Sequence, residues 1–308
     1  MPSALTVLLA GVTISGAWTR PVDIGQAGAA ASSLTQPADT RLAEASVALY
    51  AGDPDRALQL ATAYLEQHPV DIKGWVLTAR AHMARDEYAA AYGQLRKALA
   101  LAPRDIDVLY YLGFVTSQLA AREFDRLYRL APDGARVHQL MAESLKLQEK
   151  PVEAAAEYEL ALKASPNLRE ALIGLAEIRR EESNCNEAIA LYERAQALGP
   201  AYETAYGLGA CFAVQNDQPR AVKEFREALK RDPQSPAAHF ALGSSLLQMG
   251  DTISAVRELE RSVTLEPRLR QGYYLLGRAY RALGWRERSR QAFAKADELA
   301  LAERAVKN

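Results

Sequence analysis

Residues 270–296 read RQGYYLLGRAYRALGWRERSRQAFAKA and contain one copy of the pattern that decides the fold. A small residue, Gly277, is followed twelve residues later by a second, Ser289, and seven residues after that by a third, Ala296. Bulky residues lie between them at helical spacing, and a turn containing glycine divides the stretch in two. The stretch predicts two helices that pack antiparallel through their small residues.

The same pattern recurs along most of the chain. Seven prolines are separated by 34, 29, 34, 34, 33 and 34 residues: Pro69, Pro103, Pro132, Pro166, Pro200, Pro233 and Pro267. A fixed period of this length indicates a small unit that covers its apolar face by stacking on its neighbours. We therefore expect an all-α protein made of repeated helix-turn-helix units.

The small positions are kept in nearly every unit. The first helices carry Ala45, Ala79, Gly113, Ala142, Ala176, Gly209, Gly243 and Gly277. The second helices carry Ala57, Ala91, Ala154, Ala188, Ala221, Ala255 and Ser289. Small side chains at both positions allow the two helix axes to approach closely, and Gly52, Gly250 and Gly284 are placed to end first helices.

The bulky and small residues resemble the signature of the tetratricopeptide repeat. In the last unit the matching residues are Tyr273, Leu276-Gly277, Tyr280, Phe293 and Ala296, with Ser289 in place of the usual alanine. The resemblance implies an α/α superhelical solenoid of about eight repeats, whose first helices line a concave groove that binds peptides or partner proteins. The expected array covers residues 38–308, with units near 38–71, 72–105, 106–134, 135–168, 169–201, 202–235, 236–269 and 270–308.

The third unit is five residues short, because Pro103 and Pro132 are only 29 residues apart. Two structures fit: a truncated first helix with an abrupt turn near Leu119 and Ala120, or one long helix over 106–130. We favour truncation, because one long helix would reverse the direction of everything that follows. The deletion either bends the groove or is simply tolerated, and we favour the second interpretation.

The N-terminus has a different composition from the repeats. Residues 4–16 form an uncharged, largely apolar run that is too short to span a bilayer, and Ser15-Gly16-Ala17 offers a cleavage site. The first three residues lack the Lys or Arg of most export signals. We expect a signal peptide at 1–17, a flexible linker at 18–37, and a periplasmic or secreted protein with no stable membrane insertion after cleavage. A cytoplasmic protein is the alternative.

The composition excludes several classes of function. The net charge is -1, from 37 basic and 38 acidic residues, so no strong field favours nucleic acid. The four histidines fall in four different units without metal-ligand spacing. The chain also lacks a phosphate-binding glycine loop and a nucleophile motif. We predict no enzyme activity, no metal, no cofactor and no nucleic-acid partner.

Groove residues follow from the register of the first helices. Of the inward-facing positions, the candidate partner-binding residues are Arg80, Tyr110, Phe114, Glu143, Glu177, Tyr206, Phe240, Tyr274, Arg278 and Arg281. Exposed aromatic residues beside arginine are typical of interaction hot spots. Each aromatic residue alone could equally cover a neighbouring helix, whereas the run Tyr206, Phe240 and Tyr274 with Arg278 favours a binding surface.

The two cysteines lie in adjacent units, Cys185 at the turn of the fifth and Cys211 on the first helix of the sixth. An exported chain would permit a disulfide between them, and a cytosolic chain would keep both reduced.

These patterns predict a non-catalytic scaffold that binds a protein or an extended peptide in its groove. The alternative is a structural subunit of an envelope-assembly, secretion or enzyme complex that positions a catalytic partner. The oligomeric state does not follow from the sequence.

Overall fold

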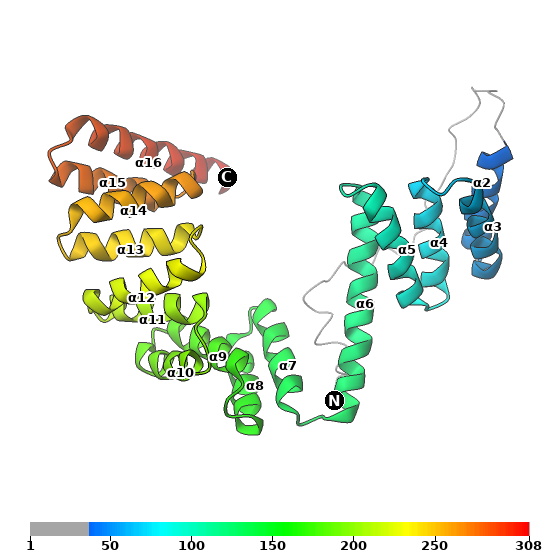
Figure 1. Cartoon of the computed structure of the whole chain (residues 1–308), viewed down its shortest axis with the longest axis horizontal. Coiled ribbons are helices and arrows are strands. Elements are labelled where there is room, and N and C mark those ends of the chain that lie inside the picture. Colours follow the sequence, from blue (N-terminus) through cyan, green and yellow to red (C-terminus); the bar gives the residue numbers. More distant parts are fainter. Residues whose placement is uncertain (1–36, 308) are drawn as a thin grey trace. The chain divides into compact units, whose positions relative to one another are not determined.

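The computed structural model describes residues 37–307, and helices are the only regular elements in that range. They form two compact units, which we call the N-terminal unit (residues 37–132) and the C-terminal unit (residues 133–307). Figure 1 shows the helices α2 to α16 along the chain. The all-α repeat fold is confirmed. The expected signal peptide and nearly all of the expected linker lie outside the described residues.

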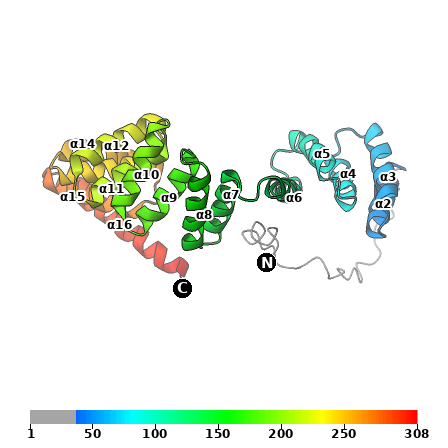
Figure 2. The same ribbon diagram turned by 90° about the horizontal axis from the view of Figure 1, so that it is seen from below.

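The N-terminal unit contains two helix pairs and one long helix. Its elements are α2 (Pro37–Tyr50), α3 (Pro54–Gln67), α4 (Ile72–Ala84), α5 (Tyr88–Leu101) and α6 (Ile106–Leu130). Figure 2 shows the pairs α2/α3 and α4/α5 beside one another, and α3 packs directly against α4. Residues 37–101 of this unit therefore form two stacked helix pairs.

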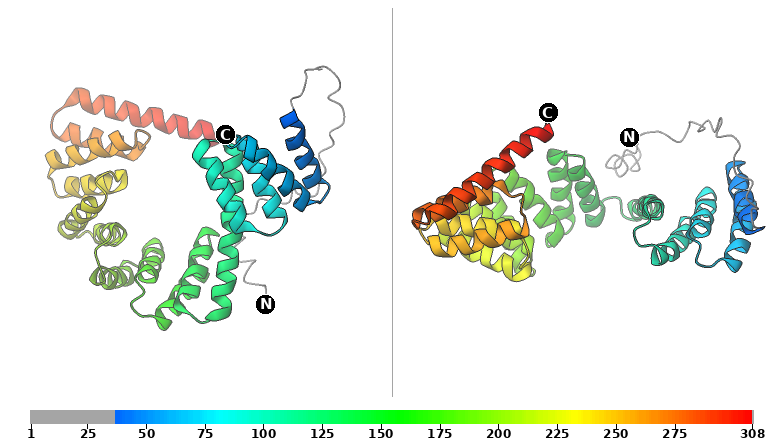
Figure 3. Two further views of the ribbon diagram at one scale, coloured as in Figure 1. Left: turned by 45° about the vertical axis from the view of Figure 1, so that its right-hand side comes forward. Right: turned by 90° about the horizontal axis from the view of Figure 1, so that it is seen from above.

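The C-terminal unit contains five consecutive helix pairs. Its elements are α7 (Ala135–Leu147), α8 (Pro151–Ala164), α9 (Arg169–Glu181), α10 (Cys185–Ala197), α11 (Tyr202–Val214), α12 (Gln218–Arg231), α13 (Pro236–Gln248), α14 (Thr252–Leu265), α15 (Arg270–Ala282) and α16 (Arg286–Lys307). The second helix of each pair packs on the first helix of the next. Figure 3 shows α16, in red, running past the end of α15.

Small residues lie where the helices of each pair cross. The alanines at the paired positions are fully buried, including Ala142 with Ala154 and Ala176 with Ala188. A Cβ atom on Gly209 would lie 2.7 Å from the ring of Phe225 on the second helix of the same pair. The predicted close crossing of the two helices is confirmed, because no larger side chain fits there.

Neighbouring repeats are joined by a second close contact that the sequence analysis missed. Tyr158 of α8 and Tyr192 of α10 are buried and point toward the first helix of the following repeat. There the tyrosine rings meet Gly174 and Gly207, where an added Cβ would lie 2.2 Å from a ring carbon. Each large side chain is thus matched to a residue with no side chain in the next repeat.

The turn between the two helices of a pair has the same geometry in all seven pairs. One residue adopts a positive φ in each turn: Gly52, Asp86, Glu149, Ser183, Asn216, Gly250 and Gly284. In the fifth repeat, Ser183 N donates to Arg180 O at 3.0 Å and Asn184 N donates to Arg179 O at 2.8 Å. These two bonds form a Schellman motif, which satisfies the last carbonyl groups of the first helix.

Glycine should improve a turn that now uses serine. Ser183 is exposed and has a φ of 63°, which strains any residue with a Cβ. We expect Ser183→Gly to raise the free energy of unfolding by about 1 kcal/mol. The measurement is urea unfolding followed by circular dichroism. Gly250→Ala, at a φ of 83° in the corresponding turn, should lower the stability by a similar amount, and equal signs for the two variants would contradict the strain argument.

The third unit does not form a helix pair, so the expected truncation of its first helix is wrong. Residues 106–130 form one continuous helix, α6, which starts at the cap where Asp105 accepts a bond from Val108 N at 3.0 Å. Residues 114–131 contain neither glycine nor proline, and the deletion removed the residues that form the turn elsewhere. Gly113 therefore has open space around it instead of a crossing helix.

Candidate functional site

The first helices of the C-terminal unit share one face, as their register predicts. Arg136 of α7 contacts Glu170 of α9 at 3.2 Å, and Lys146 of α7 contacts Glu177 of α9 at 2.6 Å. A backbone N–H and the Arg136 guanidinium lower the pKa of the Glu170 carboxyl. On the α7/α9 part of this face, the charged side chains of successive repeats therefore already neutralise one another in ion pairs.

Two predicted binding residues already have partners on this face. Glu143 accepts a hydrogen bond from Gln139 at 2.7 Å, and Glu177 is paired with Lys146. A new ligand would have to compete with these bonds for the same carboxylates. Neither residue is a strong candidate for a first contact with a partner.

The predicted aromatic binding residues of α11 and α13, Tyr206 and Phe240, are packed partly into the protein interior. Tyr206 is half-buried between Tyr202, whose ring centroid lies 5.6 Å away, and Phe225, at 5.8 Å. Phe240 is half-buried and packs against the hydrophobic cluster of the last two repeats. Both side chains cover adjacent helices while leaving one edge accessible.

The exposed face of α15 is different, because its aromatic and charged groups remain available. Tyr274 is 51% exposed and sits edge-on over Phe293, with a centroid distance of 5.7 Å. Arg278 and Arg281 follow at intervals of four and three residues, so all three share one side of the helix. The guanidinium of Arg281 lies 5.7 Å from the Phe293 centroid. We call Tyr274, Arg278 and Arg281 the α15 surface.

The arginines of the α15 surface have no acidic partner within the described part of the chain. The ion pairs of α15 and α16 there join other residues: Arg270 to Glu303, Arg288 to Glu260, Arg290 to Glu287 and Lys295 to Glu298. Both Arg278 and Arg281 are exposed. Their guanidinium groups can therefore donate hydrogen bonds to carboxylates of another molecule without breaking an existing ion pair.

A second aromatic cluster lies on the first helices of the N-terminal unit. Arg80 of α4 lies 5.4 Å from the ring centroid of Tyr50 on α2 and 5.7 Å from that of Tyr111 on α6. Tyr110 is 41% exposed and packs edge-on against Tyr111, with ring centroids 5.3 Å apart. Burial raises the pKa of Tyr111. Phe114 is half-buried beside Tyr88. We call Tyr50, Arg80, Tyr110 and Tyr111 the Arg80 cluster.

Two members of the Arg80 cluster, Tyr50 and Tyr111, were not predicted from the sequence. Tyr50 is the last residue of α2, where the resemblance gave no groove position, and it is 77% exposed. Tyr111 directly follows the predicted groove residue Tyr110, and no sequence pattern indicated that it also lies at this surface. The spacing of 30 residues between Tyr50 and Arg80 could have suggested their contact across one repeat.

The two cysteines are close together and buried. Cys185 lies close enough to Cys211 to affect the ionisation of its thiol, and both cysteines are free in this structure. Burial, together with the neighbouring Cys185, raises the pKa of Cys211 to about 12. The geometry brings the pair together as expected, and their bridging stays a prediction.

Thiol chemistry gives a direct test of this environment. The thiolate is the reactive form and burial disfavours it, so Cys211 should alkylate at least about tenfold more slowly at pH 8 in the native protein than in the unfolded reduced protein. The measurement is the rate of iodoacetamide labelling in a Cys185→Ser variant, read by mass spectrometry. Similar rates in the two states would show that Cys211 is accessible and contradict the assignment.

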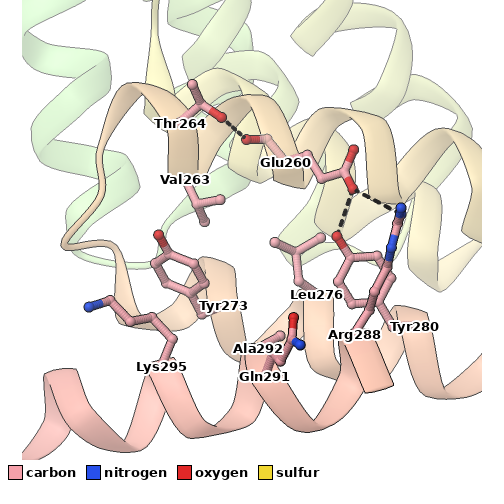
Figure 4. Close-up of a pocket in the computed structure, with 10 residues that line it drawn as sticks. All are labelled: Glu260, Val263, Thr264, Tyr273, Leu276, Tyr280, Arg288, Gln291, Ala292 and Lys295. Atoms are coloured by element: carbon pink, nitrogen blue, oxygen red, sulfur yellow. Dashed lines mark hydrogen bonds and ion pairs between the residues drawn. The ribbon is translucent and has the colours of Figure 1, made fainter. Parts of the chain in front are cut away.

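One pocket lies away from the face of the first helices. It has a volume of about 500 Å³ between α14, α15 and α16, and Figure 4 shows its lining. Tyr280 donates a hydrogen bond to Glu260 at 2.6 Å, and Arg288 approaches the same carboxylate at 3.9 Å. The only carboxylate drawn at this pocket therefore already has two partners from the protein.

The four histidines contact other residue types rather than one another: His82 pairs with Glu87, and His68 contacts the backbone oxygen of Tyr64. His138 contacts Glu157 and His239 contacts Glu258, both at 2.7 Å. Within residues 37–307 no group of three or more His, Cys, Asp or Glu residues is placed to hold a metal ion. No helix in the same range has both the length and the apolar character needed to cross a membrane.

Known proteins resemble this chain through its repeats. Two models of the tetratricopeptide repeat match, one over residues 42–106 and 173–236 and the other over residues 236–269 and 271–303. The cellulose synthase 1 operon protein C of Komagataeibacter xylinus is 34% identical over 110 residues. That match covers 34% of this chain and 8% of the relative, so the chain spans a small part of that protein.

Solved structures show the same fold. YrrB, described as a TPR protein with an unusual peptide-binding site, is 20% identical with a TM-score of 0.51, over 60% of this chain and 98% of YrrB. MamA from Desulfovibrio magneticus RS-1 is 16% identical with a TM-score of 0.51, over 55% of this chain and 96% of MamA. Helix pairs, small crossing residues and family models over more than half of the chain agree, and the chain belongs to the tetratricopeptide repeat family.

Proposed function

We propose that this protein is a non-catalytic scaffold that binds an acidic, extended segment of a partner protein on its first helices. The observation that carries the proposal is the α15 surface. Its exposed tyrosine stands beside two arginines that no described carboxylate neutralises. A partner segment with an aromatic or aliphatic side chain next to carboxylates matches these groups.

The contrast along the first helices of the C-terminal unit supports this choice. On α7 and α9 the carboxylates and basic groups neutralise one another between repeats. On α15 the basic groups are left over, so this end of the face is basic although the whole chain is nearly neutral. Complementary charge speeds association and selects acidic partners.

The Arg80 cluster offers a second contact of the same chemistry. The Arg80 guanidinium lies close to the rings of both Tyr50 and Tyr111, and these contacts fix its position before a ligand binds. A preorganised cation loses less entropy when it binds a carboxylate. Two basic and aromatic surfaces on one chain would allow two segments of a partner to bind at once.

The test uses a peptide selected from a random library against the protein. Its dissociation constant is measured by fluorescence anisotropy for the wild type and for Arg278→Glu/Arg281→Glu. Reversing both charges should weaken binding about tenfold or more, a change of about 1.4 kcal/mol. Arg286→Glu/Arg290→Glu is the matched control, because it also reverses two charges at exposed positions, here on α16. Equal losses in the two proteins, or no loss in either, would refute the α15 surface as the binding site.

The similarity to a cellulose synthase operon protein favours a second candidate. The chain would then be a structural subunit of an enzyme complex and would position a catalytic partner there. This role requires one stoichiometric partner that co-purifies with the protein, whereas a peptide-binding scaffold captures segments weakly. Gel filtration of the purified native complex distinguishes the two.

We further propose that the protein is exported after cleavage before Trp18. The apolar run at residues 4–16 and the small residues that follow it support this proposal. The intact mass of native protein from separated cell fractions should begin at Trp18 and rise by about 2 Da on reduction if the cysteines are bridged. A full-length cytosolic species with free thiols would place the protein in the cytoplasm instead.

A further inference from the structure

Helix α6 carries the contact residues of both helices of a repeat. Leu112-Gly113 holds the first-helix position, and Ala120, Phe124 and Pro132 keep the second-helix spacing of Ala221, Phe225 and Pro233. In other repeats the small residues of the pair are twelve apart and face one another across a turn. In α6, Gly113 and Ala120 are only seven apart within one unbroken helix.

The two sets of contact residues lie on the same side of α6. Seven residues make two turns of a helix and eleven make three, so Gly113, Ala120 and Phe124 align along one stripe. Ile106 and Leu109 continue this stripe and are 81% and 47% exposed. The stripe has the three- and four-residue spacing of a helix that packs on another helix.

The opposite side of α6 is already used inside the N-terminal unit. Val115 is fully buried in a cluster with Ala91 and Leu95 of α5. Arg122 reaches back to donate a hydrogen bond to Asp86 O at 2.9 Å. Helix α5 therefore holds one side of α6, and the stripe faces away from it.

The small residues on the stripe are exposed, whereas the residues at the same positions of the complete repeats are covered by the second helix of the pair. An added Cβ on Gly113 meets nothing within 4 Å, whereas one on Gly277 would lie 2.7 Å from Phe293. Gly113 and Ala120 are both exposed. Phe124 is buried and stacks on Tyr128, with centroids 6.3 Å apart, so this part of the stripe is already ordered.

We propose that two copies of this chain pair antiparallel through α6. A two-fold axis near Thr116 would set Gly113 of each copy against Ala120 of the second copy. The first half of one α6 would then meet the second half of the other, which is the pairing that every complete repeat makes within itself. The missing turn prevents this pairing within one chain. In the symmetric dimer, α6 of each copy therefore supplies the helix that the other copy lacks.

The same register also covers the exposed apolar residues of α6. It sets Ile106 against the half-buried Leu127 of the second copy, and Leu109 beside the second copy's Phe124, which is itself only 5% exposed. Both members of each pair are apolar, and the pairs lie at the two ends of the stripe. Association would thus bury Ile106 and Leu109, two of the large exposed apolar side chains of α6, which are costly to leave in water.

The test is the mass of the full chain in solution, measured by light scattering over a range of concentrations. We expect a dimer for the wild type and at least a tenfold larger dissociation constant for Gly113→Leu, because no large side chain fits at a close crossing. Gly93→Leu on α5 is the matched control, since its Cβ also meets nothing within 4 Å. It should remain dimeric, and circular dichroism should show both variants folded.

A second variant tests the cause directly. Inserting a copy of residues 250–254 between Leu119 and Ala120 restores the spacing of twelve and should let the third unit pair within its own chain. The insertion variant should then be monomeric. A wild type that is monomeric at all concentrations, or dimers that survive both Gly113→Leu and the insertion, would overturn the proposal.

Discussion

Replacing Phe225 by alanine should lower the free energy of unfolding of the C-terminal unit by about 3–5 kcal/mol. Phe225 is 1% exposed on α12 and fills the space over Gly209, where even one added carbon would be 2.7 Å from its ring. The ring also supports Tyr206, 5.8 Å away on the first helix. Its removal leaves a cavity that a glycine on the facing helix cannot fill.

Urea unfolding followed by circular dichroism measures this loss. Tyr274→Ala is the appropriate control, because it removes an aromatic ring that is 51% exposed and should cost no more than about 1 kcal/mol. Comparable losses for the two variants would mean that the ring of Phe225 is not the central contact between α11 and α12.

Gly207→Ala should destabilise the protein by about 1–3 kcal/mol although alanine is the better helix former. The new methyl group would lie 2.2 Å from Cζ of Tyr192, a ring that is 1% exposed and has no room to move aside. Because the contact joins α10 to α11, the substitution should loosen the stacking of two repeats rather than one helix pair.

Gly93→Ala separates this clash from the effect of helix propensity. The same exchange at Gly93 of α5 meets nothing within 4 Å and should stabilise the protein by about 1 kcal/mol. Circular dichroism during urea unfolding should therefore show opposite signs for the two variants. A stabilising effect of Gly207→Ala would contradict the close fit of Tyr192 between repeats.

Positions fixed by the backbone were predictable from the sequence. The period and the small residues gave the helix pairs, since a close crossing tolerates only Gly, Ala or Ser there. Glycines such as Gly250 marked the ends of first helices, and the structure gives that residue a φ of 83°. These features depend on local steric constraints, and the same residue types meet those constraints in each repeat.

Features that depend on contacts between repeats were less predictable. The match of Tyr192 with Gly207 joins residues 15 apart on different helix pairs, and no motif describes it. The continuous α6 was the less favoured of two alternatives, because its halves each carry the residues of a paired helix. The missing five residues pointed to a defect in the third unit without specifying which of the two forms it would take.

The groove register placed the candidate residues on the first helices but did not reveal which were already occupied. Glu177 and Lys146 have suitable types and positions for a partner, yet they bind one another across successive repeats. Arg278 has the same kind of position and stays free of described acidic partners. Only the contacts between helices distinguish the two cases.

The measurement that tests the proposed function most directly is site-specific crosslinking of a peptide selected for binding. A photoreactive phenylalanine analogue would replace Tyr274 in one variant and Ile253 in another, because Ile253 is 66% exposed on the second helix α14. We predict crosslinks to the peptide from position 274 and none from position 253. Crosslinks from position 253 without any from position 274 would place the ligand on the other side of the repeats and contradict binding at the α15 surface.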